Sequence, residues 1–125
     1  GLGYGDNFRA VLAAASAKEL RRFIDESYPF ERDTMDAAYL GDLLVTSYSS
    51  FSRNRRLGKL IGHGCTVKSA LNEMTMIAEG YFAANCIKHI NEKHNIYMPI
   101  AEMVYDVLYR RMSPRKRMKE LTALL

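Results

Sequence analysis

Long apolar runs, paired cysteines and strand-like alternation are all missing from this 125-residue chain. The longest apolar runs hold only a few residues, which excludes a membrane-spanning helix of about 20 residues. Cys65 and Cys86 are far apart and match neither a disulfide framework nor a metal motif, so we expect a reduced, cytoplasmic protein. A signal-peptide pattern and an initiator methionine are also absent, and we expect Gly1 to begin a piece of a longer chain.

The composition is that of an ordinary globular domain. Apolar residues make up 48% of the chain and charged residues 26%, which is not the balance of a disordered or fibrous protein. The length is sufficient for one domain with its own core. The net charge of +4 permits an anionic ligand without requiring one.

Apolar residues recur at helical spacing along almost the whole chain. The predicted helices run from Asn7 to about Tyr28, from a start at Asp33 or Thr34 through Leu44, from Ser52 to Ile61, from Thr66 to Met74, from Ala78 to Lys93, from Pro99 onward, and from Ser113 to the end. No stretch alternates apolar and polar residues with β-branched enrichment. We therefore predict an all-α domain of about six or seven helices.

Capping residues mark several of these helix ends. Asp6, Ser52, Thr66 and Ser113 stand where N-caps are expected. Pro99 and Pro114 fall at first helical positions, and "GHG" at 62–64 is a stop signal. The basic run from Arg110 to Lys119 is predicted to be a solvated face.

Two familiar kinds of site are not supported by the motifs. His89 and His94 are five residues apart, His63 lies in a predicted turn, and no Cys/His pairing exists, so no metal site is predicted. The glycines at positions 1, 3 and 5 lack the spacing and the preceding strand of a dinucleotide fingerprint. They predict a glycine-rich turn that enters a helix.

The stretch "SSFSRNRRLGK" at 49–59 carries four basic residues and no carboxylate. If Ser52 caps a helix, then Arg53 and Asn54 lie in its first turn, where free N–H groups and the helix dipole favour an anion. Arginine adds a planar fork that suits phosphate oxygens. On charge alone, a solvated face remains an equal alternative. Few aromatic residues are interleaved with the basic ones, so nucleic acid is not the expected partner.

A carboxylate stands in the apolar stretch just upstream of this cluster. Asp42 lies among leucines, and Thr46 follows one helical turn later on the same face. A carboxylate in such surroundings is either paired or functional. Asp42 therefore either pairs with an arginine of the cluster or orients a substrate hydroxyl beside a phosphate clamp.

Several motifs together resemble a known family. The segments "GLGYGDN", "LGDLLVT", "SRNRRLG", "MIAEG", "MPIAEMVYDVLY" and "SPR" resemble, in order and spacing over essentially the whole chain, the C-terminal domain of bacterial-type NAD(P)-dependent glycerol-3-phosphate dehydrogenase. The resemblance implies a two-domain enzyme with the plan of 6-phosphogluconate dehydrogenase. Residues 1–125 would form its helical substrate domain, and a Rossmann domain outside this chain would bind NAD or NADP. The implied reaction interconverts sn-glycerol 3-phosphate and dihydroxyacetone phosphate and feeds phospholipid synthesis.

The resemblance also assigns residues to the site. Asp42 is the implied catalytic residue in this chain. The implied substrate-binding residues are Asp42, Thr46, Ser52, Arg53 and Asn54, of which Thr46 rests on the eukaryotic-type relatives. The implied cofactor-binding residues are Arg53, Ile77 and Glu79. The family's catalytic lysine lies upstream of "GLGYGDN", so the chain alone is expected to be inactive; the oligomeric state stays open, with a homodimer among the options.

Two other functions compete with this interpretation. One is a helical binding module that presents a basic face to nucleic acid or to an acidic partner. The other is the helical domain of a different hydroxy-acid dehydrogenase with a similar two-domain plan. Only the "SRNRR" segment, through the resemblance, argues against the second.

Overall fold

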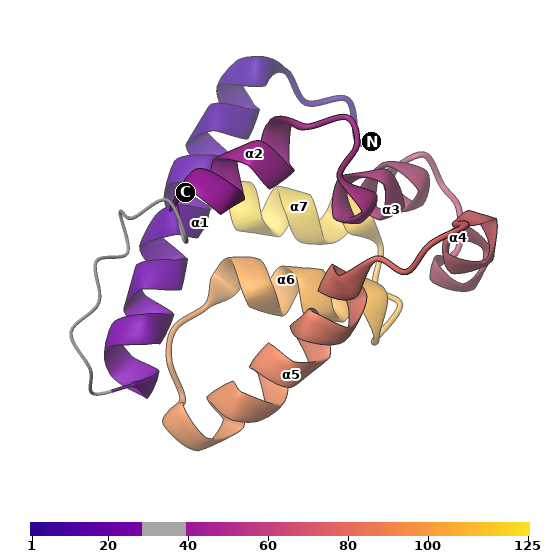
Figure 1. Cartoon of the computed structure of the whole chain (residues 1–125). Coiled ribbons are helices and arrows are strands. Elements are labelled where there is room, and N and C mark those ends of the chain that lie inside the picture. Colours follow the sequence, from indigo (N-terminus) through magenta and orange to yellow (C-terminus); the bar gives the residue numbers. More distant parts are fainter. Residues whose placement is uncertain (29–39) are drawn as a thin grey trace.

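The computed structural model describes residues 1–28 and 40–125. Within these ranges the chain forms seven α-helices and no strand, which confirms the predicted all-α class (Figure 1). The helices are α1 (Asp6–Ser27), α2 (Asp42–Tyr48), α3 (Arg53–Gly62), α4 (Val67–Glu73), α5 (Glu79–His94), α6 (Pro99–Leu108) and α7 (Pro114–Thr122). The helix start predicted at Asp33 or Thr34 lies outside the described residues.

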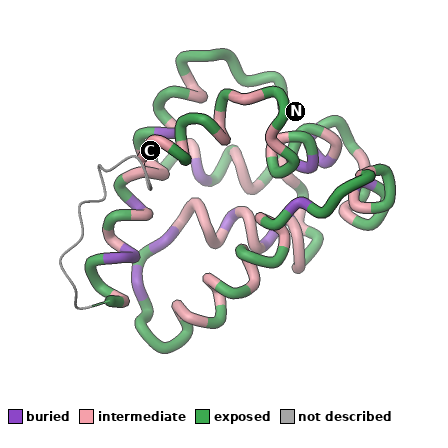
Figure 2. The backbone as a smooth tube through the Cα atoms, in the orientation of Figure 1, coloured by how far each residue is buried: buried purple, intermediate pink, exposed green. Residues whose placement is uncertain are grey.

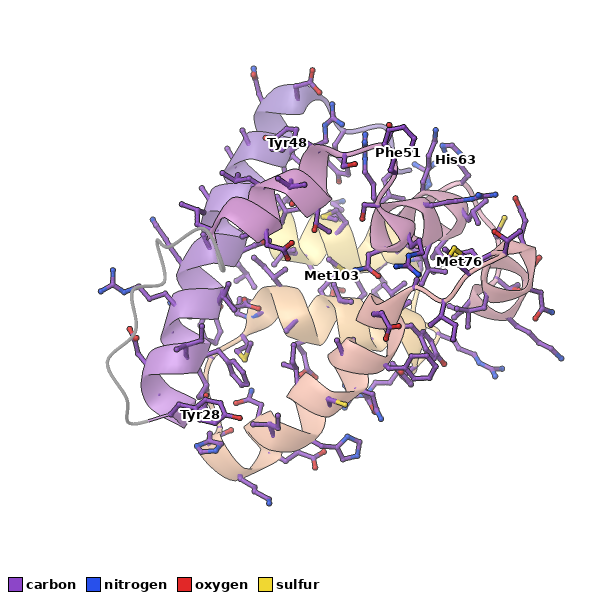
Figure 3. All side chains as sticks on the ribbon, viewed as in Figure 1. Tyr28, Tyr48, Phe51, His63, Met76 and Met103 are labelled. Carbon is purple, nitrogen blue, oxygen red and sulfur yellow. The ribbon has the colours of Figure 1, made fainter. Side chains whose placement is uncertain are left out.

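Helices α6 and α7 run side by side through the middle of the molecule, as Figure 1 shows. Helix α5 packs along α6, α1 contacts α5 and α2, and α3 contacts α2, α4, α5 and α7. Buried residues lie on the inward sides of these helices (Figure 2). The main core cluster consists of Leu57, Ile61, Ala70, Ala78, Met103, Val107 and Leu121. Met103 of α6 lies near the centre of the view in Figure 3.

Most predicted helix ends are confirmed. Ser52, Thr66 and Ser113 each accept a hydrogen bond from the backbone N–H three residues ahead, and Pro99 and Pro114 are first helical residues. The predicted cap at Asp6 is wrong. Gly5 is the N-cap of α1, and Asp6 is its first residue, whose carboxylate forms an ion pair with Arg9 instead.

Helix α1 is tied to α6 by a buried carboxylate. Glu19 is 7% exposed, and its two oxygens accept hydrogen bonds from the backbone N–H groups of Ile100 at 2.8 Å and Ala101 at 2.7 Å. These N–H groups lie in the first turn of α6, where no intrahelical acceptor exists. Glu19 therefore caps α6 from a helix about 80 positions earlier in the chain.

Burial raises the pKa of Glu19, while the two backbone hydrogen bonds and the charge of Arg22 partly offset that effect. Because the folded state holds this proton more tightly than the unfolded state, the contribution of Glu19 to stability should fall as pH rises from about 4.5 through the raised value. We expect the free energy of unfolding of wild type, minus that of Glu19→Gln, to decrease between pH 4.5 and pH 7 in urea denaturation. Glu26→Gln, an exposed change on the same helix, is the matched control; a Glu19 difference that grows with pH would refute the assignment.

A buried carboxylate on α6 also joins α6 to α7. The side chain of Asp106 is 5% exposed and accepts from Arg110 Nη1 at 2.7 Å and from Arg117 Nη2 at 2.7 Å. The side chain of Arg117 is only 20% exposed. The prediction of a solvated basic face is therefore wrong for Arg117, because this arginine packs inward onto Asp106.

Candidate functional site

The predicted phosphate-binding residues stand at the start of α3. Ser52 is the N-cap, and its Oγ accepts from the N–H of Arg55 at 3.2 Å. Arg53 and Asn54 are the first two residues of the helix, and both are exposed. No acidic residue lies in this first turn. The free N–H groups and the dipole of a ten-residue helix therefore act in the same direction as the arginine charge.

A side-chain hydrogen bond connects the start of α3 to the start of α5. The Oδ1 atom of Asn54 accepts from the backbone N–H of Gly80 at 2.9 Å. Arg53 precedes Asn54, and Glu79 precedes Gly80, so this bond brings the predicted substrate-binding and cofactor-binding segments together. We call this place the α3–α5 junction; it comprises Ser52, Arg53, Asn54, Ile77, Glu79 and Gly80.

Most of the junction is open to solvent: Arg53, Asn54, Ile77 and Glu79 are exposed, and Ser52 and Gly80 are partly buried. Glu79 is exposed at the first position of α5, and the side chain of Ile77 is 60% exposed just before it. Phe51, next to Ser52, is 94% exposed, and Figure 3 shows it at the edge of the molecule with Tyr48. The junction is thus a surface site that a ligand or a second domain can reach.

Helix α2 is attached to α3 by an arginine of the basic cluster. Arg55 donates from Nη1 to the backbone carbonyl of Tyr48 at 2.9 Å, at the last residue of α2. A cation at a helix C-terminus is favourable because the carbonyl groups there carry partial negative charge. Arg55 therefore holds α2 against α3. Arg53, in contrast, is exposed at the site.

Asp42 and Thr46 are on α2, as predicted, but they do not touch the junction. Asp42 is the first residue of α2 and is exposed, and Thr46 is partly buried one turn later. Among residues 1–28 and 40–125, neither residue forms a hydrogen bond or ion pair with α3, and no arginine pairs with Asp42. Within these ranges, the alternative that Asp42 simply pairs with a cluster arginine is thus not supported.

A mostly apolar cavity of about 430 Å³ lies behind the junction. Asn54 and Gly80 contribute to its wall, together with apolar residues such as Leu57 and Met103. Arg9 supplies the charged side chain among the described residues that line the cavity. Of the residues predicted for the site, Asn54 alone is among these lining residues. A strongly hydrated phosphate does not suit such a lining, so the outer side of the junction is the place for an anion.

The part of the chain that the structure describes contains neither a candidate metal site nor a candidate membrane-spanning helix. No group of three or more His, Cys, Asp or Glu side chains there is placed to hold a metal ion. No helix in the same ranges has the length and apolar character needed to cross a bilayer. Cys65 and Cys86 are both free thiols.

Two residues of this site were not assigned by sequence reasoning. Gly80 is the last letter of the motif "MIAEG", but nothing in the sequence indicated that it would meet Asn54, 26 positions earlier. The sequence assigned Arg55 no role of its own within the basic cluster, whereas in the structure it contacts the end of α2. The presence of Gly80 in the first turn of the predicted helix could have indicated such a contact, because glycine is disfavoured inside helices unless another group approaches closely.

Comparison with known proteins places this geometry in a family. Residues 1–119 match the family model described as "NAD-dependent glycerol-3-phosphate dehydrogenase C-terminus". The chain is 37% identical over 121 residues to glycerol-3-phosphate dehydrogenase [NAD(P)+] of Staphylococcus carnosus, which covers 97% of the chain and 36% of that relative. A relative of the same name in Salinibacter ruber is 39% identical over 121 residues, covering 97% of the chain and 35% of the relative.

A solved structure has the same fold. The crystal structure of glycerol-3-phosphate dehydrogenase from Coxiella burnetii superposes with a TM-score of 0.89 and 30% sequence identity. The match covers 94% of this chain and 36% of that one. The chain therefore spans about a third of the length of the relatives that it matches.

Proposed function

The chain belongs to the family of NAD-dependent glycerol-3-phosphate dehydrogenase C-terminal domains, and from this premise we propose that it is the substrate domain of such an enzyme. The partner within the enzyme is a nucleotide-binding Rossmann domain, and the chain together with that domain is called the two-domain enzyme below. Its proposed reaction interconverts sn-glycerol 3-phosphate and dihydroxyacetone phosphate. The two free cysteines fit a reducing, cytoplasmic setting, and a homodimer stays a prediction.

The observation that carries this proposal is the α3–α5 junction. The bond between Asn54 and Gly80 joins the segment that carries Arg53 to the segment that carries Glu79 and is assigned to the cofactor. A substrate phosphate at one end of such a site and a nicotinamide at the other would place the reacting carbon between them. Binding energy from the remote phosphate then orients that carbon, which lowers the entropic cost of reaction.

Each clamp residue contributes a different donor. Arg53 offers a planar guanidinium that matches two phosphate oxygens. The hydroxyl of Ser52 accepts from Arg55, and its own proton remains available to a phosphate oxygen. Asn54 has its oxygen committed to Gly80, so its two amide protons remain available. Thr46 on α2 is proposed to bind a substrate hydroxyl.

The residues present fit one edge of a nicotinamide cofactor. Arg53 and Glu79 supply a cation and an acceptor at an exposed site, and Ile77 supplies exposed apolar surface beside them. When NAD or NADP is bound, it supplies the hydride chemistry. The chain's own residues bind the phosphate of the substrate and orient the substrate.

Asp42 is proposed to orient the proton-transferring lysine of the family or the substrate hydroxyl. It is an exposed carboxylate at the start of α2 with no ion-pair partner in the ranges 1–28 and 40–125, which leaves it free for such a contact. A positioned acid or base contributes about 100-fold or more to a rate.

Asp42→Asn in the two-domain enzyme should therefore lower kcat about 100-fold, with a small change in the KM for dihydroxyacetone phosphate. The pH dependence of kcat should shift as well, because the amide cannot influence the ionisation of the neighbouring group. Asp25→Asn, an exposed change on α1, is the matched control and should leave both constants unchanged. Turnover of the Asp42 variant close to wild type would rule out this role.

The proposed function is tested by ligand protection. Glycerol 3-phosphate should raise the thermal unfolding midpoint of the two-domain enzyme, because a ligand that binds only the folded state stabilises it. Glycerol at the same concentration should not. Salt-dependent binding to random DNA, with no protection by glycerol 3-phosphate, would instead favour a nucleic-acid-binding module.

A further inference from the structure

We propose that Gly80 is a positioning residue: its N–H group and its missing side chain lock the amide of Asn54 so that the amide nitrogen is presented to the substrate phosphate. The inference rests on the proposed function and deepens it, because it names what fixes the geometry of one clamp residue. Gly80 itself touches neither substrate nor cofactor in this account; it acts through Asn54.

The orientation of the Asn54 amide follows from chemistry. A backbone N–H can only donate, so the atom of Asn54 that faces Gly80 at 2.9 Å is its oxygen. The amide is planar, and fixing the oxygen also fixes the nitrogen. That nitrogen has two protons, and it finds no acceptor in residues 1–28 or 40–125. Asn54 is exposed, so an anion can supply the missing acceptor.

The side chain of Asn54 lies so close to Gly80 that a Cβ atom at position 80 would displace it. A Cβ atom there would lie 2.8 Å from Oδ1, 2.9 Å from Cγ and 3.1 Å from Nδ2 of Asn54. All three atoms belong to the end of an exposed side chain, which can rotate away without moving the backbone. The expected consequence of a larger residue is thus a displaced amide in a folded protein.

The same bond has a structural interpretation, in which Asn54 merely caps α5. Gly80 is the second residue of α5, and its N–H has no acceptor within the helix. The Asn54→Asp variant separates the two roles. A carboxylate at position 54 keeps the acceptor for Gly80 and suits a helix N-terminus, but it loses both donors and repels a phosphate.

The test is a double-mutant cycle in the two-domain enzyme, read as the KM for dihydroxyacetone phosphate. We expect Gly80→Ala, Asn54→Ala and Asn54→Asp each to raise this KM about 10-fold or more. Gly80→Ala added to Asn54→Ala should cause no further loss, because the residue through which Gly80 acts is already gone. Gly58→Ala is the matched control: an added Cβ there meets nothing within 4 Å, and the KM should not change.

The other possible outcomes distinguish a failure of the positioning role of Gly80 from a failure of the proposed substrate contact of Asn54. If Gly80→Ala leaves the KM unchanged while Asn54→Ala raises it, the positioning role is wrong and the proposed clamp stands. Additive losses in the double variant would also overturn the positioning role. A wild-type KM for Asn54→Asp would overturn both this role and the proposed substrate contact of Asn54, because the variant lacks the amide donors. If Asn54→Ala has no effect, the substrate contact of the proposed function itself fails at this residue.

Discussion

Arg53→Ala in the two-domain enzyme should raise the KM for dihydroxyacetone phosphate about 100-fold, or roughly 2.7 kcal/mol of binding free energy. This large increase in KM follows from the loss of a bidentate contact between arginine and phosphate. The hydrogen bonds of such a contact are charge-assisted and about twice as strong as neutral ones. The guanidinium is exposed at the first position of α3. Because little of it is buried, its removal should leave the fold intact, and circular dichroism should match wild type.

A matched control removes the same charge elsewhere. Arg115 is exposed in the first turn of α7, and Arg115→Ala should leave the KM within about twofold of wild type, since exposed charges far from a site are screened by salt. Arg55→Ala is expected to act differently, by loosening α2 where Arg55 holds the carbonyl of Tyr48. An unchanged KM in the Arg53 variant would remove the clamp from this account.

Asp106→Ala should lower the free energy of unfolding of the chain by about 3–5 kcal/mol, the usual cost of breaking a buried ion pair. The carboxylate is 5% exposed and neutralises Arg110 and Arg117 across the contact between α6 and α7. Its loss leaves Arg117, whose side chain is only 20% exposed, with Glu120 as its remaining ion-pair partner among residues 1–28 and 40–125. Urea denaturation followed by circular dichroism measures the effect.

An exposed ion pair provides the comparison for this variant. Asp25 pairs with Arg21 on the outer side of α1, where the side chains are 53% and 66% exposed. Asp25→Ala should cost about 0.5 kcal/mol or less, because solvent screens such pairs. A loss at Asp106 no larger than the loss at Asp25 would mean that the buried network adds nothing to stability.

Local rules explain why the helices could be predicted. Ser52, Thr66 and Ser113 cap helices through bonds that reach only three residues ahead, so the sequence around each one is sufficient. Asp6 shows the limit of this reasoning. Helix α1 begins one residue earlier than expected, so Asp6 is its first residue and not its cap, and the carboxylate of Asp6 pairs with Arg9.

Contacts between segments that are distant in the sequence could not be predicted from such local rules. Glu19 and Asp106 look like ordinary helical carboxylates until folding buries them against α6 and α7. At the site, the charge of the 49–59 cluster left a solvated face and an anion site equally open. The difference between Arg53 and Arg55 appears only once α2 and α5 are in place.

The start of α3 is proposed to bind the substrate through its phosphate. The most direct measurement compares kcat/KM for dihydroxyacetone phosphate and for dihydroxyacetone, which lacks the phosphate, in wild type and Arg53→Ala. The variant should lose about 100-fold with dihydroxyacetone phosphate and almost nothing with dihydroxyacetone. An equal loss with both substrates would contradict this proposal, because the arginine would then act on something other than the phosphate.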